Sequence, residues 1–137
     1  MNANDCLEFK DVGSFLDALA NWKTFGGAVT YMIVSSRPIP RLHGASNILY
    51  FGESDNFGGN NSSRLWTYNY SRLPKYKNDY RIVEYATRLV NAGDTVSLRI
   101  CTAPPNGQTV KQHQDALLRQ YREEHWELPP LNSQCGD

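Results

Sequence analysis

The fold is decided by the stretch GAVTYMIVSSRPIPRLHGASNILYFG, residues 27–52. Its first part, GAVTYMIV (27–34), is rich in β-branched and aromatic residues and predicts a buried strand. Its last part, NILYFG (47–52), predicts a second strand. The segment between them, residues 35–46, contains two prolines and a glycine and predicts a loop. Because this connection is short, we expect the two strands to pair antiparallel.

Helical patterns flank this pair of strands. Residues 11–22 carry apolar side chains at helical spacing and predict an N-terminal helix, with Asp11 or Ser14 as its cap. Four more elements follow in order: a helix from Arg64 to the break at Leu73–Pro74, a helix over 79–91, a strand over 95–102 and a helix over 108–124. The sequence therefore predicts an α+β fold, with a small, mainly antiparallel three-stranded sheet flanked by helices.

Length and composition predict one domain over residues 1–137, with a core at about 27–132 that the N-terminal helix precedes. Hydrophobic residues make up 40% and charged residues 20%, which is ordinary for a soluble globular protein. No apolar run approaches the roughly 20 residues that span a bilayer, so no membrane contact is predicted. The polar, acidic amino terminus predicts neither a signal peptide nor a transit peptide.

The three cysteines predict free thiols. Cys6, Cys101 and Cys135 are far apart, are odd in number and lack the C-x-x-C spacing of a zinc site. Free thiols are typical of a reducing compartment, and we therefore expect a cytoplasmic location.

The charge is balanced overall but uneven along the chain. Lys and Arg total 14, and Asp and Glu also total 14. Between residues 64 and 88 there are six basic and two acidic residues, together with five tyrosines. Basic side chains neutralise phosphates and rings stack on unpaired bases, so this segment predicts nucleic-acid contacts. A solvated helix face with core tyrosines explains the same composition, and composition alone leaves both interpretations open. The predicted contact residues are Arg72, Lys75, Lys77 and Arg81.

The last predicted helix has a polar residue in its apolar stripe. Gln114 lies three residues before Leu117 and seven before Tyr121 on the same face. A buried polar group without a partner costs on the order of 1–3 kcal/mol. Gln114 is therefore either a core amide bonded to backbone or a side chain aimed into a site.

Several short motifs occur together in a characteristic order. They are the strand GAVTYMIV, the strand LYFGES (49–54), Arg64–Leu65 at the start of a helix, the helix QDALLRQY (114–121) and the terminal PPLN (129–132). This combination resembles the GIY-YIG nuclease superfamily and covers the chain from about Gly27 to Asn132. Each motif is weak alone, whereas their order, spacing and placement on strand, strand, helix and helix are fairly specific.

The resemblance implies a metal-dependent endonuclease that hydrolyses DNA with Mg²⁺ or Mn²⁺. It implies that Tyr31 and Tyr50 line the active site, one of them acting as general base toward water or orienting it. Arg64 would stabilise the charge of the transition state, and Tyr68 would lie near the leaving group or the water. Asn132 would tie the carboxy-terminal segment to the core. A phenol near pKa 10 acts as a base at neutral pH only if positive charge lowers its pKa.

The chain departs from the family at the metal ligand. Gln114 aligns with the family's metal-binding glutamate, and an amide oxygen is a much weaker Mg²⁺ ligand than a carboxylate. Either a Glu→Gln change inactivated a nuclease, or the natural protein lost cleavage and kept binding. Glu53 is a second candidate metal ligand or a partner for Arg64.

Three functional hypotheses follow from these residues. The first is a DNA endonuclease of the restriction or repair kind, active or inactivated at Gln114. The second is a nucleic-acid-binding module on the same fold without turnover. The third is a small protein-interaction domain. Target recognition by so small a chain would require a homo-oligomer, a partner protein or the two long loops predicted at 36–46 and 53–63.

Overall fold

The computed structural model describes residues 1–70 and 77–132 and contains one four-stranded sheet in that part of the chain. The strand order is β1 (Lys10–Ser14), β4 (Val96–Cys101), β2 (Val29–Pro40) and β3 (Ala45–Ser54), and all neighbours are antiparallel. The helices are α1 (Phe15–Ala20), α2 (Arg64–Asn69), α3 (Lys77–Asn91) and α4 (Val110–His125). Short 3-10 turns cover Ala3–Asp5, Trp22–Thr24 and Pro105–Gly107. The predicted α+β class and antiparallel pairing are confirmed, and the predicted count of three strands is wrong.

The extra strand comes from the segment predicted as an N-terminal helix over 11–22. Lys10–Ser14 pairs with β4 through an irregular register, in which Gly13 has a positive φ of 97°. The helix begins only at Phe15, where the Ser14 hydroxyl accepts a hydrogen bond from the Asp17 amide at 3.3 Å. Val12 fits the helical spacing of the following residues, which made the whole segment look helical. The sheet therefore begins at Lys10 and not near Gly27.

The predicted loop over 35–46 is mostly strand. β2 continues to Pro40 and pairs again with β3 at Ile39–Ser46 and Pro40–Ala45. Beyond Ser35, β2 has no partner in β4, so this half of the strand lies at an edge. Proline removes a backbone donor and is tolerated at such an edge. The prolines therefore extend the hairpin instead of ending it.

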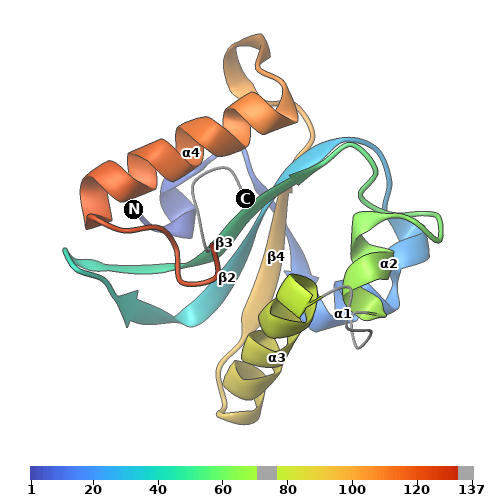
Figure 1. Ribbon diagram of the computed structural model, residues 1–137, viewed down its shortest axis with the longest axis horizontal. Helices are drawn as coiled ribbons and strands as arrows, with labels where there is room; N and C mark the ends of the chain where they lie inside the picture. Colours follow the sequence, from blue (N-terminus) through green and yellow to red (C-terminus); the bar gives the residue numbers. More distant parts are fainter. Residues whose placement is uncertain (71–76, 133–137) are drawn as a thin grey trace.

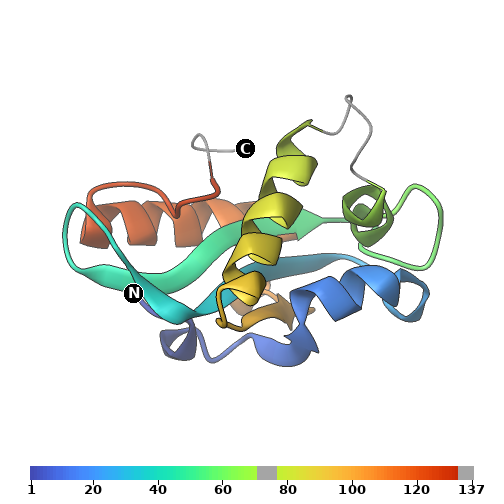
Figure 2. The same ribbon diagram turned by 90° about the horizontal axis from the view of Figure 1, so that it is seen from below.

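Helices cover both faces of the sheet. In Figure 1, α4 lies on one side of the strands, and α1, α2 and α3 lie on the other. Figure 2 shows α1 and α2 beside α3. Successive residues of β2 alternate between the two sides. Tyr31 and Ile33 pack in the core with α1–α3, whereas Met32 and Val34 pack in a second core with α4. Each face of β2 therefore serves a different core.

The carboxy-terminal segment covers the free edge of β3. The Leu131 amide donates to the Leu49 carbonyl at 2.9 Å. Asn132 then accepts from the Phe51 amide at 3.0 Å and donates to the Phe51 carbonyl at 3.0 Å. These bonds use the outward groups that an edge strand would otherwise leave open. This is the contact expected of a residue that ties the carboxy-terminal segment to the core.

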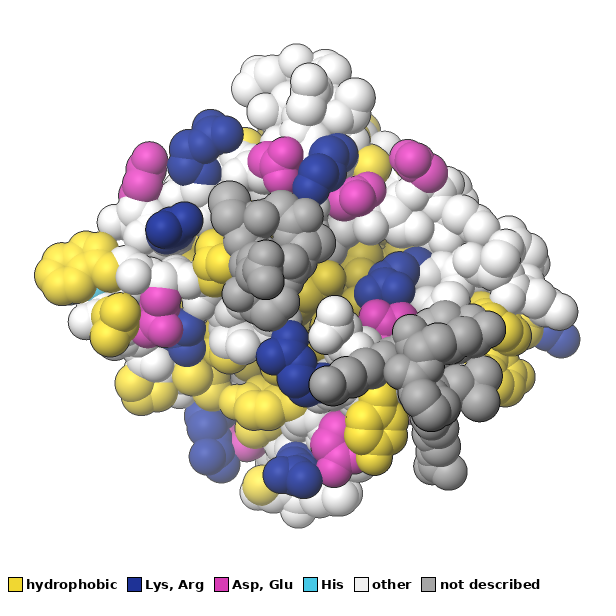
Figure 3. Space-filling view, in the orientation of Figure 1, with side chains coloured by type: hydrophobic (Ala, Val, Ile, Leu, Met, Phe, Trp, Pro, Cys, Tyr) yellow, Lys and Arg dark blue, Asp and Glu magenta, His cyan; other side chains and the backbone are white. Residues whose placement is uncertain are grey.

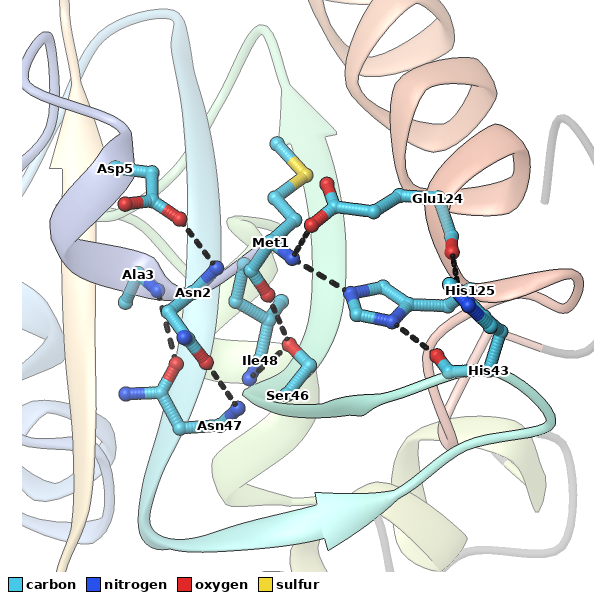
Figure 4. A network of polar contacts seen from close by, with 10 residues as sticks. All are labelled: Met1, Asn2, Ala3, Asp5, His43, Ser46, Asn47, Ile48, Glu124 and His125. Carbon is cyan, nitrogen blue, oxygen red and sulfur yellow. Dashed lines mark hydrogen bonds and ion pairs between the residues drawn. The ribbon is translucent and has the colours of Figure 1, made fainter.

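The amino terminus is fastened to the end of α4 (Figure 4). The Met1 ammonium forms an ion pair with Glu124 and lies 2.7 Å from Nε2 of His125. Nδ1 of His125 lies 2.8 Å from the His43 carbonyl, which can only accept, so Nδ1 donates and Nε2 accepts. The Ser46 hydroxyl donates to the Met1 carbonyl at 2.5 Å. Met1, Ala3 and Cys6 of this polar segment thus contribute to the core beneath α4, which the composition of the segment did not indicate.

Cys6 and Cys101 are buried free thiols, and Cys135 lies outside the described residues. Burial raises the pKa of the Cys6 thiol to about 12. Across residues 1–70 and 77–132, none of the helices has both the length and the apolar character needed to cross a bilayer.

Candidate functional site

Three side chains named from the sequence meet through their polar ends. The hydroxyls of Tyr31 and Tyr68 lie 2.8 Å apart, and Nε of Arg64 donates to the Tyr31 hydroxyl at 3.3 Å. The Arg64 guanidinium lies 4.3 Å from the centre of the Tyr68 ring. Tyr31 comes from β2, whereas Arg64 and Tyr68 lie one helical turn apart on α2. The fold therefore joins residues that are more than thirty positions apart in the sequence.

Gly52 makes room for this contact. A Cβ atom added at Gly52 would lie 2.3 Å from Cζ and 2.5 Å from the hydroxyl of Tyr31. Gly52 pairs with Tyr31 across the β2–β3 ladder, so the tyrosine ring folds over the glycine backbone. The glycine of the LYFGES motif is thus required by the position of the Tyr31 ring.

Tyr50 forms a wall of a small hollow beside the cluster. Its ring centre lies 6.0 Å from that of Tyr31. The hollow has a volume of about 210 Å³ and is open on one side. Its lining comes from β3, α2, α3 and the carboxy-terminal segment, and consists of Tyr50, Arg64, Asn78, Asp79, Arg81, Ile82 and Leu131. Of the four predicted catalytic residues, Tyr50 and Arg64 line this hollow, while Tyr31 and Tyr68 are almost fully buried.

The counter-ion of Arg64 is Asp79. Nη1 and Nη2 of Arg64 donate to the two carboxylate oxygens at 2.8 and 2.7 Å. The Arg64 side chain is 27% exposed and that of Asp79 is 10% exposed. Glu53 is a candidate partner for Arg64 in the sequence, but in the structure Asp79 has that role. In the sequence Asp79 is only one of the two acidic residues within the basic segment 64–88, because nothing local links positions fifteen residues apart.

Burial has the largest effect on the pKa of Tyr50 and Tyr68. Burial raises the pKa of Tyr50 and Tyr68, with a smaller contribution from the nearby Tyr31, and the positive charge of Arg64 offsets this only in part. Burial alone would lower the pKa of Arg64, but Tyr68, Tyr31 and Asp79 raise it above its ordinary value. The net pKa of Tyr50 and Tyr68 is therefore raised, so neither phenol meets the condition for a general base at neutral pH. At neutral pH their hydroxyls are protonated hydrogen-bonding groups.

Gln114 lies apart from this cluster. It is 1% exposed on α4, which covers the opposite face of the sheet from Tyr31. Its amide donates to the Phe51 carbonyl at 3.1 Å, the same carbonyl that accepts from Asn132. Gln114 thus reaches the strand that carries Tyr50, but from the other side. The backbone contact matches the core-amide interpretation.

The described donors do not fit a magnesium site. Mg²⁺ prefers charged oxygen ligands in octahedral geometry. Among the described residues that line the hollow, Asp79 is the only one with a carboxylate, and Arg64 occupies both of its oxygens. Within residues 1–70 and 77–132, no three His, Cys, Asp or Glu side chains are grouped as metal ligands would be. No catalytic step is therefore assigned to a metal.

The predicted nucleic-acid contacts are only partly described. Arg81 is exposed, lines the hollow and donates to the Leu131 carbonyl at 3.1 Å. Lys77 begins α3, while Arg72 and Lys75 lie outside the described residues. On the face shown in Figure 3, the described Lys and Arg side chains are interspersed with Asp and Glu and form no continuous basic patch.

Comparison of the chain with protein-family models, with curated protein sequences and with solved structures found no match.

Proposed function

We propose that the chain is a nuclease-type domain, similar to the GIY-YIG superfamily, that binds the phosphodiester backbone of DNA at Arg64 and Tyr50. The observation that supports this proposal is the contact of Arg64 with Tyr31 and Tyr68 at the wall of an open hollow. These side chains occupy the motif positions on which the resemblance was based. The contact also gives the buried tyrosines a polar role, which a protein-interaction domain with purely structural tyrosines would not need.

The chemistry of the site suits a phosphate group. A guanidinium is planar, permanently charged and able to bind two oxygens at once. Tyr31 and Tyr68 hold its inner side, so little side-chain freedom is lost when an anion binds the outer side. Tyr50, protonated at neutral pH, can donate to a phosphate oxygen, and Arg81 adds a second positive charge. These residues bind and orient a phosphodiester, and the raised pKa values of Tyr50 and Tyr68 argue against proton abstraction by either.

The first test is DNA binding as a function of salt. We expect the wild type to bind a short duplex with an affinity that falls steeply as salt rises, because phosphate contacts release counter-ions. Arg64→Ala should weaken binding roughly tenfold and reduce the salt slope by about one. Arg88→Ala is the matched control, since Arg88 is 76% exposed and paired with Glu84 within α3. If the two variants bind equally well, Arg64 is not the phosphate contact.

DNA cleavage is the second candidate function. It is favoured by the arginine held between Tyr31 and Tyr68 and is opposed by the placement of Gln114, which lies on the other face of the sheet and cannot supply a metal ligand at the hollow. Wild type and Arg64→Ala should be assayed on supercoiled plasmid with and without Mg²⁺ or Mn²⁺. Nicking by the wild type that Arg64→Ala abolishes at saturating protein would support a nuclease that uses Arg64. If the wild type binds DNA but does not cut it, the chain is a binding module.

A further inference from the structure

Asp79 holds Arg64 in the geometry that a phosphate would use. Two parallel hydrogen bonds, 2.8 and 2.7 Å long, join the outer nitrogens of the guanidinium to the two carboxylate oxygens. Arginine binds carboxylates and phosphates through this same planar, two-point contact. The carboxylate therefore stands where a bidentate anionic ligand would stand.

The rest of the guanidinium is also engaged. Nε donates to the Tyr31 hydroxyl at 3.3 Å, and Nη1 lies 3.3 Å from the Thr67 hydroxyl. A phosphate that binds Arg64 through both Nη atoms must displace Asp79 or share the nitrogens with it. Two anions at one guanidinium repel each other, so displacement is the outcome favoured by electrostatics.

Asp79 neutralises the charge of Arg64 and borders a space into which its carboxylate can move. Arg64 is mostly buried, and a buried charge without a partner is costly. Asp79 lies in the first turn of α3 and borders the same open hollow of about 210 Å³ as Arg64 and Arg81. A carboxylate released from Arg64 can turn into this hollow or toward Arg81 while the ligand takes over the neutralisation of Arg64.

We propose that Asp79 is an internal competitor for the anion site, so that its carboxylate occupies the phosphate position of Arg64 in the free protein and sets the affinity for phosphate groups. The identity of the ligand as nucleic acid rests on the proposed function. The competition itself does not, because it applies to any phosphate group that reaches Arg64.

The decisive variant is Asp79→Asn, which keeps the size of the side chain and removes its charge. We expect it to bind duplex DNA roughly tenfold more tightly than the wild type at low salt, since one anion no longer opposes another. Glu84→Gln is the matched control, because it removes the same charge from an exposed position on the same helix. Its affinity should change far less than that of Asp79→Asn.

Thermal unfolding with inorganic pyrophosphate provides a second measurement. Asp79→Asn leaves Arg64 without its counter-ion and is expected to lower the melting temperature. Pyrophosphate should raise the melting temperature of Asp79→Asn more than that of the wild type or Glu84→Gln. Adding Arg64→Gln to Asp79→Asn should remove this extra stabilisation.

The outcomes separate the two proposals. If pyrophosphate stabilises Asp79→Asn through Arg64 but DNA does not bind, the competition stands and the nucleic-acid function is wrong. If DNA binding depends on Arg64 and Asp79→Asn binds no more tightly, or more weakly, then Asp79 positions Arg64 and the competition is wrong. If neither ligand binds any form, both proposals are overturned.

Discussion

Two groups of buried polar side chains on the sheet form different kinds of hydrogen bond. On the face covered by α1–α3, Tyr31, Tyr68 and Arg64 bond one another, and Arg64 extends to an open hollow. On the α4 side and along the adjoining edge, Gln114 and Asn132 bond the backbone of Phe51 instead. A bond between side chains can be exchanged for a ligand without exposing backbone groups, whereas a bond to backbone cannot. The cluster around Arg64 is therefore available for binding, whereas Gln114 and Asn132 support the fold.

The largest expected effect on stability comes from a cavity in the core beneath α4. Leu118 is fully buried in the core with Met32, Val34 and Phe51. Leu118→Ala should lower the free energy of unfolding by about 2–5 kcal/mol, because it removes apolar contacts and leaves a cavity. Urea unfolding measures the loss, and DNA affinity corrected for the folded fraction should stay unchanged. A large loss of affinity per folded molecule would show that the two faces are not independent.

Gly52→Ala tests the face covered by α1–α3, because it displaces the Tyr31 ring. The new methyl group would overlap the Tyr31 ring and force it away from Tyr68 and Arg64. We expect a loss of about 1–3 kcal/mol in stability, as for other overpacked sites, together with weaker DNA binding. Gly26→Ala is the control, since a Cβ there meets nothing within 4 Å. Unchanged DNA affinity in Gly52→Ala would show that the position of Tyr31 does not affect DNA binding.

Asn132→Ala tests the edge of β3. It removes the partner of the Phe51 amide, while the Phe51 carbonyl keeps its bond from Gln114. Leaving one buried amide without its acceptor should cost roughly 1–2 kcal/mol of stability. Hydrogen exchange at the Phe51 amide should accelerate at the same time. Slow exchange in the variant would mean that the tail is held by other contacts.

The smallest effect is expected at alkaline pH. The pKa of Tyr50 is raised by burial, whereas an unfolded tyrosine ionises near about pH 10. Above that pH the unfolded state loses the proton while the folded state keeps it, so stability falls as pH rises. Tyr50→Phe should show a shallower fall than the wild type between about pH 9 and 11 in urea unfolding. Parallel curves would indicate that Tyr50 ionises equally in both states.

Much of the site was visible in the sequence because strands and helices impose fixed periods. The apolar, β-branched composition of 27–34 and 47–52 predicted β2 and β3, and the short connection predicted their antiparallel pairing. The predicted helix start at Arg64 is confirmed. Whether a strand tyrosine serves a site or only the core depends on neighbours that composition does not reveal.

The sequence by itself determined the α+β class, the central hairpin and the candidate site residues, because local propensity and alternation are properties of short segments. Only the tertiary structure decided that Lys10–Ser14 is a strand, since its pairing partner β4 lies more than eighty residues away. It also decided that Arg64 pairs with Asp79, and that Gln114 lies on α4 across the sheet from Tyr31. The physical reason is the same in each case. Pairing and burial are set by segments distant in the chain, and a local pattern carries no information about which of them will meet.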